Sequence, residues 1–183
     1  MSEERDGFYV FPERAKAKLR KAYTEKQPVY IYGMVGYGKT ALVEQFLGKK
    51  KYIYFDAASS PLACLEALHT QSILVVDNLQ FLEDEFVKDR LLELIRQSEL
   101  WLIFISRSKC PGWLISAYLK YRNFCTITET DLELSEEEIR SYLKGRGIEE
   151  YGPNDVRFVQ SYCRGHGLAI RLLCDQALIE GRP

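Results

Sequence analysis

Apolar runs and amphipathic segments alternate along most of the chain. The runs Ile73–Val76 and Leu100–Ser106 are almost continuously apolar, as expected of strands that are covered on both faces of a parallel sheet. Further β-favouring runs lie at Val29–Tyr32, Tyr52–Phe55 and Phe124–Thr128. Because strands that alternate with helical segments are typical of βαβ units, the pattern predicts an α/β fold with a parallel five-stranded sheet and flanking helices.

The segments between these strands carry apolar residues at helical spacing. We expect a basic helix over Pro12–Lys26, a helix over Ala41–Leu47 and a short one over Pro61–His69. Two longer helices have apolar stripes that predict which of their side chains are buried. The stripe of the first consists of Phe86, Leu91, Leu92 and Ile95, and that of the second of Trp113, Leu114, Tyr118 and Leu119.

In the last third of the chain, helical patterns follow one another without a strand between them. Ser135 and Glu138 have the spacing of a capping box, which predicts the start of a helix. Further helices are expected over Pro153–Cys163 and Leu168–Ile179. The sequence therefore predicts an α/β domain over residues 1–132 and a small helical lid over residues 133–183.

The stretch Gly33–Thr40 reads G-M-V-G-Y-G-K-T and fits the phosphate-binding pattern G-x-x-x-x-G-K-[ST] between a strand and a helix. Its glycines permit the backbone angles that aim successive N–H groups inward, and the following helix places the positive end of its dipole at the same point. The stretch therefore predicts a site for the phosphates of ATP or ADP. The expected binding residues are Gly33, Val35, Gly36, Tyr37, Gly38, Lys39, Thr40 and Ala41.

Three side chains are expected to bind the phosphates and their metal ion. Lys39 should reach the β- and γ-phosphates, and the Thr40 hydroxyl should ligate Mg²⁺. Asp77 directly follows the apolar run Ile73–Val76, so its carboxylate is expected at the end of a strand beside the loop. There it can hold Mg²⁺ through the water shell of the ion. Thr40 and Asp77 together are the predicted metal site.

The set of residues that would activate the attacking water lacks one carboxylate. Many P-loop ATPases place a second carboxylate directly after the strand-end acid, but here that position is Asn78. Since an amide can orient water but cannot accept its proton, we expect slow ATP hydrolysis. Arg107 follows the strand Leu100–Ser106, and its planar guanidinium either contacts a γ-phosphate or lies in a surface loop. The catalytic candidates are Lys39, Asp77, Asn78 and Arg107.

Two segments are candidates for the base side of the nucleotide. In P-loop ATPases the segment that enters the first strand often borders the base, which makes Tyr9–Pro12, and Pro12 in particular, a candidate wall. His166 lies between two glycines in the predicted lid. A contact between this ring and the nucleotide, and a hydrogen bond between the ring and backbone, are both open.

The composition limits the expected partners and compartment. With a net charge of −1 and no basic run, the chain has no electrostatic footprint for nucleic acid. No apolar run reaches the roughly 18 residues of a membrane span, and the polar start carries no targeting signal. A cytoplasmic location without membrane contact is therefore expected. Five scattered cysteines without a C-x-x-C pair argue against a disulfide framework and a zinc site.

Together these motifs resemble the STAND class of signal-transduction ATPases, in particular the nucleotide-binding domain of MalT-like, LuxR-type bacterial transcriptional regulators. The resemblance rests on G-Y-G-K-T at Gly36–Thr40, V-V-D-N at Val75–Asn78 and I-S-R-S at Ile105–Ser108, followed by Pro111. It continues with R-G-H-G-L-A-I at Arg164–Ile170, which is similar to the turn that opens the final lid helix in that family. It covers most of the chain and implies a switch between ATP-bound and ADP-bound states.

The sequence departs from the family pattern at three places. Asn78 stands where the family has a second Asp, and Gly167 stands where it has a proline that packs on adenine. The interval between Phe55 and Ile73 is shorter than in the family, which suggests a trimmed domain. By position, Gly167 remains a nucleotide-binding candidate. The resemblance further implies self-association in the ATP-bound state, and DNA binding only through a C-terminal domain that is absent from this chain.

Three other functions stay open at the level of sequence. An AAA-type ATPase that acts on DNA has the same loop, strand-end acid and lid, but normally has a Glu in the position of Asn78. A small-molecule kinase needs an acceptor base, which is not evident, and a basic lid. A non-hydrolysing nucleotide-binding interaction module is the third. The charge for a basic lid would come from Arg140, Arg146, Arg157 and Arg164.

Overall fold

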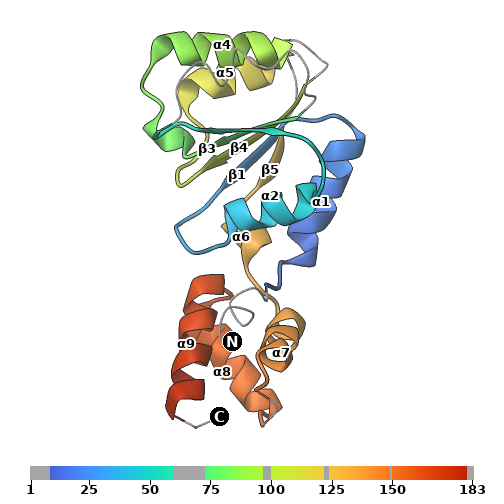
Figure 1. Ribbon diagram of the computed structural model, residues 1–183, viewed down its shortest axis with the longest axis vertical. Coiled ribbons are helices and arrows are strands. Elements are labelled where there is room, and N and C mark those ends of the chain that lie inside the picture. The colour runs from blue at the N-terminus through green and yellow to red at the C-terminus, as the bar shows by residue number, and fades with distance from the viewer. Residues whose placement is uncertain (1–8, 60–72, 97–99, 122–123, 149, 181–183) are drawn as a thin grey trace.

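The computed structural model describes residues 9–59, 73–96, 100–121, 124–148 and 150–180 (Figure 1). All pairings in its five-stranded sheet are parallel, and the strand order is β2-β3-β4-β1-β5. The predicted α/β fold with a parallel five-stranded sheet is thereby confirmed. The predicted helix Pro61–His69 lies outside the described residues. The strands are β1 (Val29–Tyr32), β2 (Ile53–Asp56), β3 (Ile73–Asp77), β4 (Trp101–Ser106) and β5 (Cys125–Ile127).

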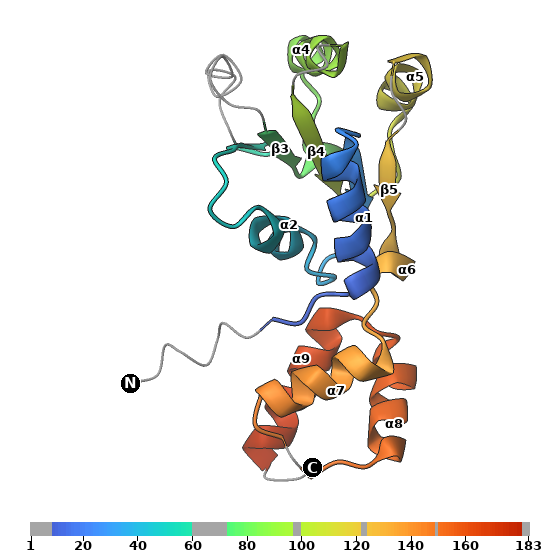
Figure 2. The ribbon, with the colours of Figure 1, turned by 90° about the vertical axis from the view of Figure 1, so that its right-hand side faces the viewer.

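Helices cover the sheet on both faces. Helices α1 (Glu13–Thr24) and α2 (Lys39–Leu47) lie on one face, and α4 (Glu85–Arg96) and α5 (Gly112–Tyr121) lie on the other (Figures 1 and 2). All six residues of β4 are buried. Because side chains alternate along a strand, they divide between two cores. Trp101, Ile103 and Ile105 pack with α1 and α2, whereas Leu102 and Phe104 pack with α4 and α5.

Two side chains that were predicted to be buried are exposed instead. Phe86 is 66% exposed, because the buried stripe of α4 consists of Val87, Leu91, Leu94 and Ile95, and Phe86 lies one residue out of phase with it. Leu119 is 76% exposed, because α5 turns Leu114 and Ala117 toward the sheet. The predictions for Phe86 and Leu119 were therefore wrong.

The strand order creates a crevice at the carboxyl ends of β1 and β4. These strands are neighbours, with Tyr32 paired to Ser106 at their ends. From β1 the chain leaves through α2 toward β2 at one edge, and from β4 it leaves through α5 toward β5 at the other edge. Adjacent strands whose connections run to opposite faces leave a crevice between them, which is where open α/β sheets bind ligands.

The chain then passes through the short helix α6 (Glu129–Leu132) into a helical lid formed by α7 (Glu136–Gly145), α8 (Pro153–Cys163) and α9 (Gly167–Glu180). The lid lies beyond the carboxyl ends of the strands (Figure 1). It has a buried cluster of its own, separate from the two cores of the sheet. Members of this cluster are Leu134, Ile139, Tyr142, Leu143, Val156, Val159, Cys163, Ile170 and Cys174.

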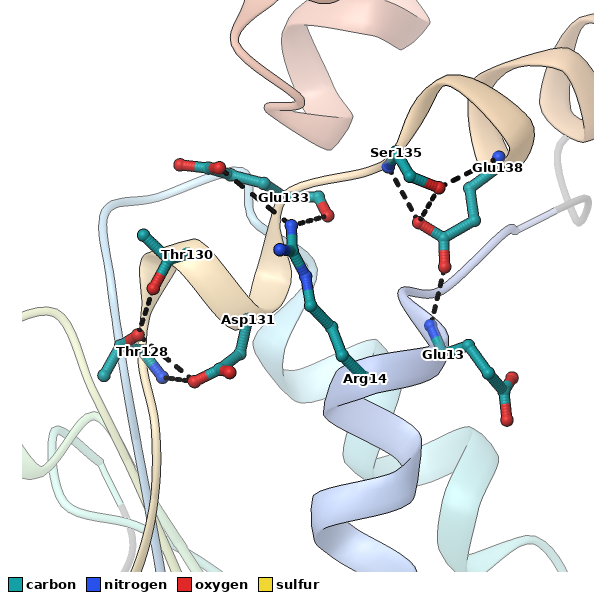
Figure 3. A network of polar contacts seen from close by, with 8 residues as sticks. All are labelled: Glu13, Arg14, Thr128, Thr130, Asp131, Glu133, Ser135 and Glu138. Atoms are coloured by element: carbon teal, nitrogen blue, oxygen red, sulfur yellow. Dashed lines mark hydrogen bonds and ion pairs between the residues drawn. The ribbon is translucent and has the colours of Figure 1, made fainter.

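A polar network joins the lid to the first helix (Figure 3). Ser135 and Glu138 form the predicted capping box, in which the Ser135 N–H donates to Glu138 Oε2 at 2.8 Å. The other oxygen of Glu138 accepts the N–H of Glu13 at 2.6 Å, at the start of α1. Arg14 donates to the carbonyl of Glu133 at 2.7 Å. The Glu138 carboxylate therefore lies at the N-termini of both α1 and α7, where its negative charge interacts favourably with both helix dipoles.

The remaining bulk predictions concern cysteines and membranes. The cysteines within the described ranges are free thiols, and Cys64 lies outside those ranges. Among the helices described, none combines the length and the apolar character that crossing a bilayer demands.

Candidate functional site

A cavity of about 380 Å³ lies between the carboxyl ends of the strands and the lid. Its volume falls within the range of about 300–1,000 Å³ that is usual for small-molecule sites. Gly33, which was predicted to bind phosphate, does not line it; its N–H donates to the carbonyl of Ser106 at 3.3 Å. The predicted residues that do line it are Pro12, Val35, Gly36, Tyr37, Gly38, Lys39, Thr40, Ala41, Asp77, Asn78, Arg107 and Gly167.

The loop between β1 and α2 has the backbone of an anion cradle. Gly36 and Gly38 have φ angles of 93° and 74°, which favour glycine. Within the described part of the chain, the N–H groups of Val35 to Lys39 have no hydrogen-bond partner. Glu129 of α6 braces the start of the loop, where its Oε1 accepts the Met34 N–H at 2.8 Å. A row of unpaired N–H groups at a helix N-terminus suits a phosphate.

The Lys39 side chain is folded back against this loop. Its Nζ donates to the carbonyl of Gly33 at 2.6 Å and to that of Met34 at 2.8 Å. Burial lowers the pKa of Lys39, although the nearby carboxylate of Asp77 opposes that shift. The ammonium is thus already largely removed from water and held beside the cavity, where an incoming phosphate would interact with it strongly.

Asp77 is the centre of a tight oxygen cluster. Its Oδ2 accepts from the Thr40 hydroxyl at 2.7 Å and from the Tyr54 hydroxyl at 2.8 Å, and its Oδ1 accepts the Asn78 N–H at 2.6 Å. Burial, and then the bond to Asp77, raise the pKa of Tyr54 above its usual range. A hydroxyl and a carboxylate this close fit a hard cation such as Mg²⁺. Tyr54 was missed, because in sequence it is only an alternating residue of a strand.

The Asn78 side chain, directly after β3, forms hydrogen bonds to Asp56 at the end of β2 and to Gln80. Its Nδ2 donates to Asp56 Oδ1 at 3.0 Å, and its Oδ1 accepts from Gln80 Nε2 at 3.3 Å. Burial raises the pKa of Asp56, but hydrogen bonds from Ala58, Asn78 and Ser59 outweigh it and leave that pKa below its usual value. Asp56 and Gln80 were also missed, because Asp56 lies on another strand, β2, and Gln80 forms its longer-range hydrogen bonds at the end of β4. The lining residue Asn78 offers the cavity no proton acceptor.

Gln80 connects this region to the end of β4. Its Oε1 accepts from the Arg107 N–H at 3.0 Å and from the Ser106 hydroxyl at 3.2 Å. The guanidinium of Arg107 lies over the Phe81 ring, 5.7 Å from its centroid. Arg107 thereby lines the cavity with its backbone anchored and its side chain stacked on an aromatic face.

Apolar and aromatic side chains from the segment before α1 form another part of the cavity wall. Tyr9, Val10, Phe11 and Pro12 all line it, and the rings of Tyr9 and Phe11 are stacked at 5.8 Å. The lid adds Tyr142, Arg146 and Arg171, and Arg146 forms an ion pair with Asp175. Of the four arginines considered for a basic lid, only Arg146 is among the described residues that line the cavity. This wall is suited to a flat ring system.

The lid touches the loop between β1 and α2 directly through His166. Its Nε2 lies 2.8 Å from the Val35 carbonyl oxygen, and its ring packs edge-on against Tyr37 at 4.5 Å. Of the two interpretations left open by the sequence, the structure therefore shows the hydrogen bond to backbone. The acceptor lies 131 residues away, so no local pattern indicates it.

Comparisons with known proteins agree with this architecture. No protein-family model matches the sequence, and no curated protein matches it significantly. Among solved structures, the Walker-type ATPase PABY2304 of Pyrococcus abyssi superposes with a TM-score of 0.65 at 14% identity, over 94% of this chain and 69% of that one. The STAND protein PH0952 from Pyrococcus horikoshii, which has a tetratricopeptide repeat sensor, superposes with a TM-score of 0.65 at 16% identity. That match covers 92% of this chain and 30% of the other, and together the two likenesses show that the chain has the fold of Walker-type and STAND ATPases.

Proposed function

We propose that the chain is the nucleotide-binding module of a STAND ATPase, which binds ATP and ADP and hydrolyses ATP slowly. The observation that carries the proposal is the row of N–H groups from Val35 to Lys39, which have no hydrogen-bond partner among the described residues, beside a buried ammonium and an apolar wall. These are the three contacts that a nucleoside triphosphate needs: amides for phosphate oxygens, a cation for their charge, and a surface for the base.

Each polar residue of the cavity has a role in this proposal. Lys39 would exchange its two carbonyl acceptors for phosphate oxygens. Thr40 and Asp77 would hold Mg²⁺, which neutralises phosphate charge when it is bound. Arg107 would meet the γ-phosphate at the end of β4. Tyr9 to Pro12 and Gly167 would border the base.

The switch is proposed to act through differential binding. A γ-phosphate shifts a conformational equilibrium only by contacts that are better in one state than in the other. Lys39 and Arg107 lie on the sheet domain, and residues of the lid line the same cavity. We propose the division at residues 132 and 133 as the boundary between the moving parts, supported by the separate buried cluster of the lid. A role in a LuxR-type regulator, self-association with ATP, and DNA contact through another domain are the finer proposals, supported by motif resemblance.

The test of nucleotide binding is to identify the ligand that purified protein carries. We expect ADP or ATP to be released on denaturation and to be identified by ion-exchange chromatography. Protein that carries no nucleotide and shows no binding of ADP or ATP in calorimetric titration with Mg²⁺ would refute the proposed function. GTP in the same titration tests whether the apolar wall selects the base.

We predict that Asn78→Asp accelerates ATP hydrolysis by about tenfold or more, because a carboxylate accepts the proton that the amide cannot. The new carboxylate would face Asp56 Oδ1, now 3.0 Å from Asn78 Nδ2, and repulsion between like charges would raise its pKa and make it a better base. The measurement is steady-state phosphate release. Asn78→Ala is the control, because it removes the same amide without adding a base. An unchanged rate in Asn78→Asp would mean that the attacking water is activated elsewhere.

A further inference from the structure

The turn between α8 and α9 and the start of α9 are hydrogen-bonded to the loop between β1 and α2, and we call this contact the clasp. Two hydrogen bonds cross from the turn to the loop: His166 Nε2 to the Val35 carbonyl at 2.8 Å, and the Leu168 N–H to the Gly36 carbonyl at 3.0 Å. The fit is close. A Cβ added to Gly36 would lie 2.5 Å from His166 Cε1, so only glycine allows the turn to approach this far.

The partners of His166 define which nitrogen carries its proton. A carbonyl oxygen only accepts, so Nε2 donates to Val35. The Ala169 N–H only donates, so Nδ1 accepts it, at 3.2 Å. The ring is therefore neutral, with its proton on Nε2. Its two nitrogens have separate roles: Nδ1 accepts an N–H in the first turn of α9, as an N-cap does, and Nε2 donates to the loop between β1 and α2.

The two crossing bonds also determine where the loop N–H groups point. A peptide unit is planar and trans, so the N–H of a residue points opposite to the carbonyl of the preceding residue. A bond that draws the Val35 carbonyl toward the lid turns the Gly36 N–H away from His166. The bond from Leu168 to the Gly36 carbonyl does the same for the Tyr37 N–H. Both N–H groups belong to the row of the cradle that has no hydrogen-bond partner in the described ranges.

Given the proposed nucleotide-binding function, we propose that His166 is a positioning residue for the phosphate site. Through Nε2 it holds the peptide unit between Val35 and Gly36 in the orientation that presents the Gly36 N–H to phosphate. The position of the lid thereby determines the fraction of molecules whose cradle is ready to bind. Apparent affinity scales with that fraction, so a weaker clasp lowers affinity without any loss of phosphate contacts.

Two substitutions separate the two roles of the ring. His166→Asn places an amide oxygen where Nδ1 lies, so it keeps the helix cap and loses the reach to Val35. His166→Gln places an amide N–H near the position of Nε2, so it keeps the donor to Val35. We expect His166→Asn to bind ADP with Mg²⁺ about five- to tenfold more weakly than the wild type, as for the loss of one hydrogen bond. His166→Gln should stay within about threefold of wild type.

The measurement is calorimetric titration with ADP and Mg²⁺, together with thermal unfolding of the nucleotide-free proteins. The positioning role is supported if both variants unfold at the wild-type temperature and only His166→Asn binds the nucleotide more weakly. Wild-type affinity in His166→Asn, equal losses in both variants, or a loss that follows a lower unfolding temperature would each overturn it. Lys39→Ala is titrated alongside. If Lys39→Ala also binds like the wild type, the proposed phosphate site itself is refuted. If Lys39→Ala loses binding, a negative result for His166→Asn counts only against the role of His166.

Discussion

Lys39→Ala is expected to weaken binding of ATP and ADP by about hundredfold, or about 2.7 kcal/mol. Charge-assisted hydrogen bonds contribute about 1.5–3 kcal/mol each, and the Lys39 ammonium is positioned to make such bonds to phosphate oxygens. Lys39 is only 9% exposed, and its Nζ already lies at the loop, 2.6 Å from the Gly33 carbonyl oxygen. Little ordering of the side chain is therefore required when phosphate arrives.

The control for this variant is Lys49→Ala, which removes the same charge from an exposed position just after α2. Affinity is measured for both variants by calorimetric titration with Mg²⁺ and either nucleotide. Lys49→Ala should bind like the wild type, because a solvated charge outside the cavity is screened by salt. Binding by Lys39→Ala within about threefold of wild type would place the phosphates elsewhere.

Gly165→Ala is expected to lower the free energy of unfolding by about 2–5 kcal/mol, from backbone strain together with overpacking. Gly165 has a φ of 70°, and an added Cβ would lie 2.8 Å from both Glu133 Cβ and Leu134 N. The Gly165 carbonyl also accepts the Leu134 N–H at 2.9 Å. Relief of the clash requires that the linker into the lid and the turn before α9 move apart.

Gly147→Ala is the matched control, because Gly147 also has a positive φ, of 76°, but no atom lies within 4 Å of an added Cβ. It should cost only the strain of the left-handed conformation, about 1–2 kcal/mol. Urea unfolding followed by circular dichroism gives both values from the midpoints, provided that the slopes agree. Equal losses in the two variants would show that strain alone matters at Gly165 and that the contact with the linker is loose.

Much of the fold could be predicted from short-range patterns. The apolar run at β3 and the glycine pattern at the phosphate loop each report a local requirement, burial on two faces or a permitted backbone angle. The Ser135–Glu138 capping box is local in the same way, and the structure shows it. The burial of Phe86 was predicted wrongly, because the phase of a helix against a sheet depends on the neighbours that surround it.

The supporting residues of the candidate site could not be predicted in this way. Tyr54 binds Asp77 from a strand 23 residues earlier, and Gln80 binds the backbone of Arg107 27 residues later. Glu129 braces the Met34 N–H across 95 residues. Each is an ordinary polar residue in its own segment. Its role arises only where the sheet brings strand ends together.

The sequence by itself therefore determined the alternation of strands and helices and the location of the glycine-rich loop between β1 and α2, because both depend on residues close together in the chain. Only the tertiary structure decided what surrounds that loop: Tyr54 on Asp77, Gln80 between two strand ends, and His166 on the Val35 carbonyl. The physical reason is that strand order and lid position are set by the burial of whole faces. The hydrogen bonds that shape the cavity depend on that arrangement, because they join groups that no local pattern relates.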